Sequence, residues 1–348
     1  MGNINNYMIN TTIIHINLAS GFGGGEVQTL NLIKELSDYN QLIITKNRSP
    51  FSNRINELSQ NQGNISQVSI TKAIKFCWKN KKVIIHAHDG RGAHVARLIG
   101  TVTNKKYVIS RRVDKLLKGK SSEKSYQKAA AIVAVSEKVA GNVRELNENT
   151  HVIYDSYSRL PYHPSILTKL NSLEGKFIVT QLGSLLDIKN IPFTIELAKR
   201  LETSHPFIHF LIVGEGKEEE KLKEMAEGLT NLTFFGFTPY VASILKLTNL
   251  LCMPSKSEGL GSAILEAYQH NIPVIASNVG GMPEIVIHNE TGYLIELNDL
   301  DTAEKDVITL ATDKDIYRKF VENISQNKMK YSPEHMAQSY IKCYRHIL

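Results

Sequence analysis

The stretch SEGLGSAILEA, residues 257–267, places two carboxylates eight positions apart, on Glu258 and Glu266. A helix is predicted to begin near Gly261, because the residues that follow favour helix and repeat apolar side chains at helical spacing. The free backbone N–H groups at such a helix start attract phosphate oxygens, and carboxylates accept hydrogen bonds from sugar hydroxyls. The stretch favours binding of a sugar that carries a diphosphate, although a surface helix with an unrelated glutamate pair is the simpler account of the pair taken alone.

Short apolar segments flank this stretch and predict β-strands. Residues 250–254 form an apolar run that leads into the loop, and residues 272–277 form another that ends before the Gly280-Gly281 pair. Further strands are predicted upstream, over residues 177–182, 208–213 and 232–235. Strands that alternate with helical segments imply a parallel sheet covered by helices on both faces.

The N-terminal half repeats this alternation. Strands are predicted over residues 12–18, 42–45, 83–86, 107–110 and 131–135, with a helix over 26–36 after the first of them. Because 348 residues exceed the usual size of one core, we expect two α/β domains, over residues 1–160 and 173–332. The weakly periodic segment 157–172, which contains proline and serine, is the predicted linker.

Composition places the chain among ordinary globular proteins, with 42% hydrophobic and 22% charged residues. No apolar run is long enough for a membrane span, and no signal peptide is evident. Met1 to Asn10 is polar and predicts a frayed tail. Three widely spaced cysteines without a CxxC pattern suit reduced thiols, so we expect a cytoplasmic protein.

Charge is unevenly divided between the two halves. Residues 1–175 hold 24 Lys and Arg against 12 Asp and Glu, a formal charge of +12, whereas the remainder holds 17 against 22, which gives the whole chain +7. A basic half of this kind favours an anionic partner, which could be phospholipid, an anionic glycan or nucleic acid.

The C-terminal half resembles the retaining glycosyltransferases of family 4. The shared features are Pro254-Ser255, the Glu-Gly-x-Gly sequence from Glu258, its glutamate pair, Pro273-Val274 and the Gly-Gly-x-x-Glu sequence from Gly280, and they are most specific over residues 176–297. The resemblance implies the GT-B fold, in which two Rossmann-like parallel-sheet domains face each other across a cleft. It also implies that the last helix, here residues 333–348, returns to the N-terminal, acceptor-binding domain.

The resemblance assigns donor-binding roles in the second half of the chain. Lys189 places a point charge on the diphosphate, Glu258 binds the donor sugar and Glu266 binds the ribose. Gly183 and Ser184 are also expected to contact the donor. Ser184 replaces the arginine that usually follows this glycine, which weakens the expected binding of the diphosphate, although its hydroxyl can still donate one hydrogen bond. The remaining predicted donor contacts come from the segment before the helix and from the base-binding segment: Phe237, Gly259, Leu260, Gly261 and Ser262.

In the first half, the resemblance identifies Gly23, Gly24 and Gly25 as a loop beside the transferred sugar and the acceptor. His88 and Asp89 are expected near the acceptor. Arg112 stands where most members have a histidine that contacts the donor sugar. An arginine there suits an anionic acceptor, or compensates for the charge that Ser184 lacks. We therefore predict Glu258, Lys189, Arg112 and His88 as the catalytic group.

Two patterns raise the question of a metal. His86 and His88 lie on one face of a strand, but His94 is the only candidate for a third ligand. Because no other ligand follows at a suitable spacing, we expect no metal site. Asp299-Leu300-Asp301 has the DxD form associated with divalent metals, yet it precedes a predicted helix, and we interpret Asp299 as an N-cap.

Lysines and aromatic residues mix over residues 72–82, which include Phe76 and the only tryptophan, Trp78. A second lysine-rich segment covers residues 115–128. Each segment alone is accounted for equally well by a solvated helix face. Because both lie in the basic half, we expect contact with an anionic membrane and a peripheral position at its inner face.

The predicted function is transfer of a sugar, with retention, from a nucleotide-diphosphate sugar to a glycan or lipid-linked saccharide, as in lipopolysaccharide, capsule or other surface polysaccharide assembly. We expect a UDP-sugar by default, no cofactor, no metal and no nucleic acid partner. A GT-B nucleotide-sugar epimerase or phosphorylase is one alternative. A non-catalytic basic module that binds membrane or nucleic acid is another.

Overall fold

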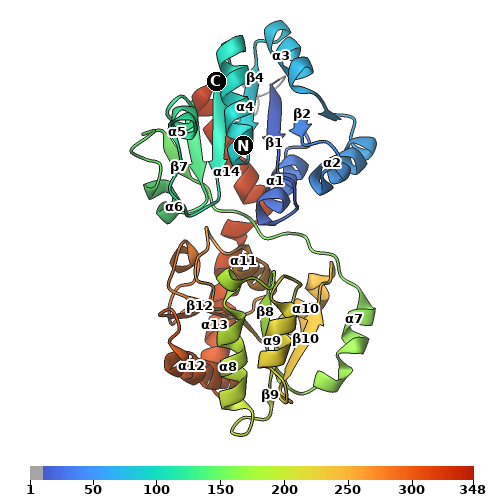
Figure 1. The fold of residues 1–348 in the computed structure, drawn as a ribbon, viewed down its shortest axis with the longest axis vertical. Helices are drawn as coiled ribbons and strands as arrows, with labels where there is room; N and C mark the ends of the chain where they lie inside the picture. The colour runs from blue at the N-terminus through green and yellow to red at the C-terminus, as the bar shows by residue number, and fades with distance from the viewer. Residues whose placement is uncertain (1–10) are drawn as a thin grey trace. The chain divides into compact units, whose positions relative to one another are not determined.

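The computed structural model describes residues 11–348, so the tail expected over residues 1–10 lies outside the described part of the chain. The chain divides into two compact units. Unit 1 comprises the residues up to Ser158 together with Tyr331–Leu348, and unit 2 comprises Arg159–Lys330. Figure 1 shows the elements of each unit.

Unit 1 contains a seven-stranded sheet in the order β3-β2-β1-β4-β5-β6-β7, in which all paired strands are parallel. The strands and helices of unit 1 are β1 Thr12–Asn17, α1 Gly24–Glu35, β2 Asn40–Thr45, α2 Pro50–Asn61, β3 Ile65–Gln67, α3 Ile70–Lys79, β4 Val83–Ala87, α4 Gly90–Thr103, β5 Tyr107–Arg111, α5 Lys120–Gln127, β6 Ala131–Ala134, α6 Glu137–Gly141, β7 Thr150–Val152 and α14 Pro333–Ile347. The prediction of a parallel sheet interleaved with helices is confirmed for this unit.

Both faces of this sheet are buried, which explains why its strands are almost continuously apolar. Along β1, Ile14 and Ile16 enter the core cluster that includes Ala96 and Ile99 of α4, whereas Ile13 enters the cluster on the other side, with Leu32 of α1. Side chains alternate between the two faces of a strand, so one short segment supplies both layers of the core.

Helix α14 covers the face that carries Ile13. Its Met336, Ala337 and Tyr340 pack in the same cluster as Ile13. Two tyrosine hydroxyls of α14 also reach polar groups inside the sheet. The hydroxyl of Tyr344 lies 2.6 Å from Nδ1 of His86, and that of Tyr340 lies 2.8 Å from Oγ of Ser110. The last helix of the chain is therefore part of the unit 1 core.

Unit 2 contains a six-stranded parallel sheet in the order β10-β9-β8-β11-β12-β13. Its elements are α7 Pro164–Lys169, η1 Asn171–Leu173, β8 Phe177–Leu182, η2 Asp187–Lys189, α8 Ile191–Leu201, β9 Ile208–Val213, α9 Glu219–Met225, β10 Leu232–Gly236, α10 Val241–Leu247, β11 Leu250–Met253, α11 Ser262–Gln269, β12 Val274–Ser277, η3 Met282–Glu284, β13 Gly292–Ile295, α12 Leu300–Thr312 and α13 Lys314–Asn327, with η4 Lys328–Tyr331 at its end.

The segment expected to be a linker contains structure of its own. Helix α7 buries Ile166, and Leu170 and Leu173 follow it into a core cluster with Ile178 and Leu211 of the sheet. Pro164 starts this helix at a position where its missing N–H costs nothing. Residues 164–172 of the segment predicted to be the linker therefore belong to unit 2 and supply part of its core.

We predict that Tyr344→Phe lowers the free energy of unfolding by about 1–3 kcal/mol, because it leaves Nδ1 of the fully buried His86 without its hydrogen-bond partner. Urea denaturation measures this change. Gln338→Ala, at an exposed position of the same helix, is the control and should be close to neutral. Equal stability of Tyr344→Phe and the wild type would show that the hydroxyl contributes nothing to holding α14.

Candidate functional site

Two predicted donor-binding residues of unit 2 meet at the carboxyl edge of its sheet. Lys189, in the turn after β8, forms an ion pair with Glu258, in the loop after β11. Their side chains are 24% and 16% exposed, so the pair is neither buried nor fully solvated. Loops that follow adjacent parallel strands come together at one edge of a sheet, and such edges are where ligands bind in open α/β sheets.

The turn that carries Lys189 is fixed by two side chains that sequence reasoning missed. Gln181 of β8 donates from Nε2 to the carbonyl oxygen of Lys189 at 2.7 Å. Asn190 adopts a left-handed conformation with φ of 54° and donates to the carbonyl oxygen of Pro254 at 3.1 Å. The sequence could have pointed to Gln181, because a side-chain amide in a mostly apolar strand needs a hydrogen-bond partner when it is buried.

The loop that carries Glu258 depends on Gly280. This glycine has φ of +60°, and a Cβ atom there would lie 1.9 Å from the carbonyl oxygen of Glu258. The next residue, Gly281, donates its N–H to that same oxygen at 3.2 Å. The Gly-Gly pair therefore lets two loops pass in direct backbone contact and sets the position of Glu258.

Helix α11 begins at Ser262, one residue after the predicted start, with Gly261 as its N-cap at φ of +98° and no capping side chain. In its first turn, Ile264 donates to the carbonyl oxygen of Gly261 at 2.9 Å, whereas the N–H groups of Ser262 and Ala263 precede the first intrahelical acceptor. The side chain of Leu260 is buried, so only its backbone can serve a donor, while Gly259 is partly buried. Ser184, at the predicted arginine position, is exposed beside Gly183.

Glu266 lies in the second turn of α11, partly buried. Loss of hydration raises the pKa of its carboxyl group to about 7. A carboxylate that is costly to ionise gains more than an exposed one from hydroxyl donors that replace the lost water. This arrangement suits the ribose-binding role predicted for Glu266.

The segment expected to hold the nucleotide base contains three phenylalanines with different surroundings. Phe235 and Phe234 pack against separate core clusters, which supports the core-packing account of both residues. Phe237 is 66% exposed, so its ring face is open for stacking.

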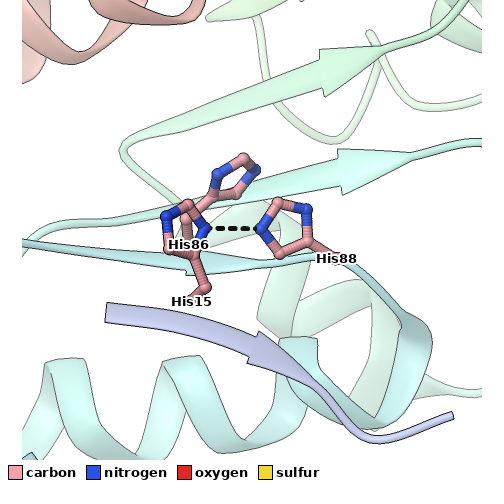
Figure 2. Close-up of side chains that lie close together, drawn as sticks. All are labelled: His15, His86 and His88. Atoms are coloured by element: carbon pink, nitrogen blue, oxygen red, sulfur yellow. Dashed lines mark hydrogen bonds between the residues drawn. The ribbon is translucent and has the colours of Figure 1, made fainter. Parts of the chain in front are cut away.

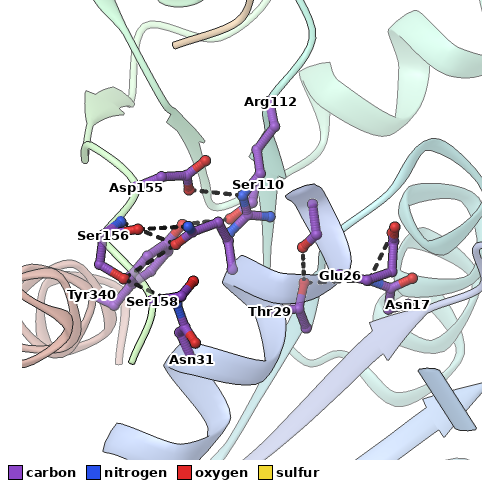
Figure 3. Close-up of polar contacts among 12 residues, drawn as sticks. Asn17, Glu26, Thr29, Asn31, Ser110, Arg112, Asp155, Ser156, Ser158 and Tyr340 are labelled. Atoms are coloured by element: carbon purple, nitrogen blue, oxygen red, sulfur yellow. Dashed lines mark hydrogen bonds and ion pairs between the residues drawn. The ribbon is translucent and has the colours of Figure 1, made fainter. Parts of the chain in front are cut away.

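In unit 1, the glycine loop leads directly into α1, which begins at Gly24, two residues before the predicted start. Glu26 closes a capping interaction by accepting the N–H of Gly23 at 2.9 Å. Its other carboxylate oxygen lies 3.4 Å from Nδ2 of Asn17, the last residue of β1 (Figure 3). The conformation of the glycine loop is therefore set by Glu26, the acid of the Gly-Gly-x-Glu sequence.

His88 is buried in a cluster of three histidines. Nδ1 of His15 and Nε2 of His88 lie 2.9 Å apart, and the rings of His86 and His88 have centroids 3.9 Å apart (Figure 2). The histidine next to the predicted pair is thus His15, on the neighbouring strand β1. His94, the third ligand considered from the sequence, instead lies 3.3 Å from Oγ of Ser125.

Burial keeps these rings neutral. It lowers the pKa of His15 to about 3 and the pKa of His86 and of His88 well below the usual value, and the nearby charge of Arg112 lowers the last two further. Both ring nitrogens of His86 are already engaged, by Tyr344 and by Ser110 at 2.8 Å. A cation in the cluster would have to displace these hydrogen bonds beside a guanidinium.

Arg112 forms a buried ion pair that the sequence did not reveal. Its Nε donates to Oδ1 of Asp155 at 2.9 Å, and the two side chains are 8% and 9% exposed (Figure 3). Asp155 raises the pKa of Arg112, which offsets the effect of burial. Among the described residues, neither Nη1 nor Nη2 of Arg112 has a hydrogen-bond partner. The free edge of the guanidinium therefore remains able to donate.

Two aspartates singled out in the sequence cap helices in the structure. Asp89 N-caps α4 by accepting the N–H groups of Arg91 and Gly92, each at 2.8 Å, which gives it a structural role in addition to the predicted acceptor contact. Asp299 accepts the N–H of Thr302 at 3.1 Å and caps α12, so its interpretation as an N-cap is confirmed.

Unit 1 also has two cavities at the carboxyl edge of its sheet. One, of about 780 Å³, lies at the ends of β1, β2 and β3, with Leu18, Lys46 and Gln67 in its wall. The other, of about 430 Å³, shares Leu18 and is lined by Asp89, Arg91 and His94. Both volumes suit a small ligand, and they flank the segment that leads into the glycine loop.

Comparison with known proteins finds a family model that matches within unit 2. Residues 164–327 match the family model described as "Glycosyl transferases group 1". The N-acetyl-alpha-D-glucosaminyl L-malate synthase of Bacillus anthracis is 24% identical over 64% of this chain and 61% of its own length. The UDP-Gal:alpha-D-GlcNAc-diphosphoundecaprenol alpha-1,3-galactosyltransferase of Escherichia coli is 33% identical over 40% of this chain and 38% of its own. The chain thus spans less than two thirds of the length of these relatives.

Among solved structures, HepE of Anabaena in complex with UDP superposes with a TM-score of 0.83 and 17% identity, over 97% of this chain and 100% of that one. The two parallel α/β units and this superposition define the fold as that of the GT-B glycosyltransferases, as predicted. Within it, residues 164–327 are similar to the group 1 glycosyltransferases. No helix among residues 11–348 is both long and apolar enough to cross a membrane.

The raised pKa of Glu266 predicts opposite effects of pH on donor binding and on stability. Its carboxyl group binds a proton more tightly in the folded chain than in the unfolded one, so folding stability falls as pH rises from about 4.5 to about 7. Ionisation over the same range strengthens the acceptor for the predicted ribose contact, so donor affinity is expected to rise with pH through about 7.

We predict that the free energy of unfolding of the ligand-free wild type falls by about 1–3 kcal/mol between pH 5 and pH 8 through ionisation of Glu266. The Glu266→Gln variant should not show this part of the decrease. The same variant should bind UDP more weakly at pH 8 and lose the change in affinity near pH 7. Urea denaturation and calorimetric titration with UDP at several pH values measure the two effects. If UDP affinity changes with pH in the same way for the variant and the wild type, the pH dependence belongs to the nucleotide phosphates and not to Glu266.

Proposed function

We propose that this chain is a retaining glycosyltransferase that moves a sugar from a nucleotide-diphosphate sugar to a glycan or lipid-linked saccharide in surface polysaccharide assembly. The observation that carries the proposal is the Lys189–Glu258 ion pair at the edge of unit 2 that also holds the uncapped start of α11. This arrangement places a cation, free N–H groups and a hydroxyl-accepting carboxylate at the ends of adjacent strands.

The proposed donor site divides the work among these groups. Lys189 and the N–H groups of Gly261 and Ser262 stabilise the negative charge that develops on the departing diphosphate. Glu266 accepts hydrogen bonds from the ribose, and Glu258 from hydroxyls of the sugar. In the free protein Lys189 is neutralised by Glu258, so binding exchanges one carboxylate partner for phosphate oxygens and frees Glu258 for the sugar.

The proposed chemistry breaks the bond between the anomeric carbon and the phosphate oxygen and forms a bond from that carbon to the acceptor oxygen. The acceptor's proton passes to the departing phosphate oxygen on the same face of the sugar, which preserves the anomeric configuration. The enzyme's part is positioning and electrostatic stabilisation, and the route needs no protein nucleophile.

The substrates are proposed from the relatives and from unit 1. UDP is bound in the HepE structure, and a UDP-sugar stands in the name of the E. coli relative. The two curated relatives carry malate and a diphosphoundecaprenol-linked sugar in their names, both of which are anionic. We place the acceptor at the carboxyl edge of unit 1, near the glycine loop, His88 and Arg112.

A screen of UDP-, GDP- and ADP-sugars by thermal shift tests the donor site, because a ligand that binds only the folded state raises the melting temperature. We predict stabilisation by a UDP-sugar that Lys189→Ala abolishes. Lys256→Ala is the matched control, since Lys256 pairs with Asp187 at 2.6 Å in an exposed ion pair close by. Loss of stabilisation in both variants would point to general charge rather than to Lys189.

Turnover tests the reaction itself. We predict that Glu258→Gln lowers transfer by about 10²-fold or more while the protein remains folded. Product formed without any acceptor would favour an epimerase, and phosphate-dependent cleavage of a glycan would favour a phosphorylase. A chain that neither binds nor cleaves any nucleotide sugar would leave the non-catalytic basic module as the better account.

A peripheral position on the inner face of an anionic membrane completes the proposal, and the basic first half of the chain supports it. We predict that vesicle binding weakens as salt rises, because each lysine near an anionic surface contributes about 1 kcal/mol over a screening length of about 10 Å. Replacement by alanine of Lys75, Lys79, Lys81 and Lys82 should reduce sedimentation with anionic vesicles and leave donor affinity unchanged.

The charge-matched control replaces four exposed lysines of unit 2: Lys199, Lys217, Lys221 and Lys314. It should sediment with the vesicles like the wild type. Equal sedimentation of the wild type with neutral and anionic vesicles would contradict a membrane partner and leave a soluble acceptor.

A further inference from the structure

Helices α3 and α4 of unit 1 pack against each other and expose three large apolar side chains. Trp78 is 63% exposed, Leu98 52% and Val102 48%. The indole N–H of Trp78 points to the carbonyl oxygen of Val102, at 3.4 Å, and Leu98 lies one turn before Val102 on the same face of α4. The three residues therefore form one apolar strip that bridges the two helices.

The three residues of the strip are not needed to fill the core of unit 1. Ala73 and Cys77 of α3 are buried in the unit 1 core, and Phe76 packs against the same cluster. The inward face of α3 is thus already filled, and Trp78 lies outside it. An exposed cluster of large apolar side chains on a folded surface marks an interaction site rather than a packing requirement.

Strong positive charge surrounds the strip. Residues 70–106, which span both helices, hold nine Lys and Arg and a single acid, Asp89, whose carboxylate is engaged in capping α4. Lys75 and Lys79 are exposed on α3. Nζ of Lys105 donates to the carbonyl oxygen of Lys81 at 3.1 Å, so the segments that follow the two helices lie side by side.

We propose that this strip is a membrane-docking face, whose Trp78, Leu98 and Val102 enter the headgroup region of an anionic bilayer while the surrounding lysines bind lipid phosphates. Tryptophan with aliphatic residues inside a rim of lysines is the composition of surfaces that lie in the membrane interface. A second copy of this chain fits the strip less well, because two such faces would bring like charges together.

The orientation of α4 connects this face to the acceptor cavity. Arg91, Val95, Leu98 and Val102 follow helical spacing along one side of α4, and Arg91 also lines the cavity of about 430 Å³. A helix of 14 residues is about 20 Å long, so a docked strip holds that cavity within about one helix length of the lipid. Resting on the proposed function, this distance suits an acceptor whose saccharide is attached to lipid.

Trp78 is the only tryptophan of the chain, so its fluorescence reports this face alone. The full-length protein is mixed with vesicles of roughly one part phosphatidylglycerol to two parts phosphatidylcholine, with and without brominated acyl chains. We expect a blue shift of the emission and quenching by the brominated lipid. Unlike attraction by the lysines, the apolar contribution is not screened, so part of the shift should persist as salt rises.

The double variant Leu98→Ser/Val102→Ser keeps the probe and should bind the vesicles about tenfold more weakly or worse. Met329→Ser is the matched control, because Met329 is 61% exposed but lies in unit 2, and it should bind like the wild type. Stabilisation by UDP is measured on the same proteins and should be unchanged. If UDP stabilises neither the wild type nor the variants, the result counts against the proposed donor site and not against the docking face.

An emission maximum that does not move with anionic vesicles would overturn the proposal, as would equal binding by the double variant and the wild type. The emission maximum of Trp78 could instead shift with protein concentration in the absence of lipid. If the double variant abolishes that shift, the strip is a contact between copies of the chain. A shift produced by an RNA oligonucleotide but not by vesicles would assign it to nucleic acid.

Discussion

A parallel sheet that is covered by helices on both faces can offer polar groups to a ligand only at the ends of its strands. The strand interiors in the two units are used mainly for packing, and polar side chains there bond within the unit, as Nε2 of Gln181 does to the carbonyl oxygen of Lys189. The groups suited to chemistry lie one to seven residues past the end of a strand: Lys189, Glu258, Asp89 and Arg112. Their location follows from the architecture before any role is assigned.

The two ion pairs among these residues differ in their surroundings and therefore in what they can do. Lys189 and Glu258 keep access to solvent, and ion pairs of that kind contribute little to stability. Such a pair can separate to receive a charged ligand at small cost. Arg112 and Asp155 are almost fully buried, where removal of either partner leaves an uncompensated charge. That pair fixes the guanidinium in place and leaves its buried Nη1 and Nη2 without a hydrogen-bond partner among the described residues.

Local patterns predicted most of the fold, and contacts between distant segments account for what they missed. Apolar runs located β8 and β9 to the residue, because buried parallel strands carry an unbroken signal. The position of His15 beside His88 required the pairing of β1 with β4, and the partner of Arg112 lies 43 positions away. Helix α7 was missed since six residues are too few for periodicity. The outward direction of the Trp78 side chain could have been predicted from the helical spacing, because Ala73 and Cys77 lie on the inner face of the same helix.

The histidine cluster shows how a buried group can set the chemistry of a neighbour. His15 and His88 are both neutral, and one proton lies between Nδ1 of His15 and Nε2 of His88. If His15 supplies it, the remaining proton of His88 sits on Nδ1, and if His88 supplies it, Nδ1 carries a lone pair. Nδ1 of His88 has no partner among the described residues. Whether that atom can donate or accept a hydrogen bond therefore depends on the tautomer of His15, a buried residue inside β1.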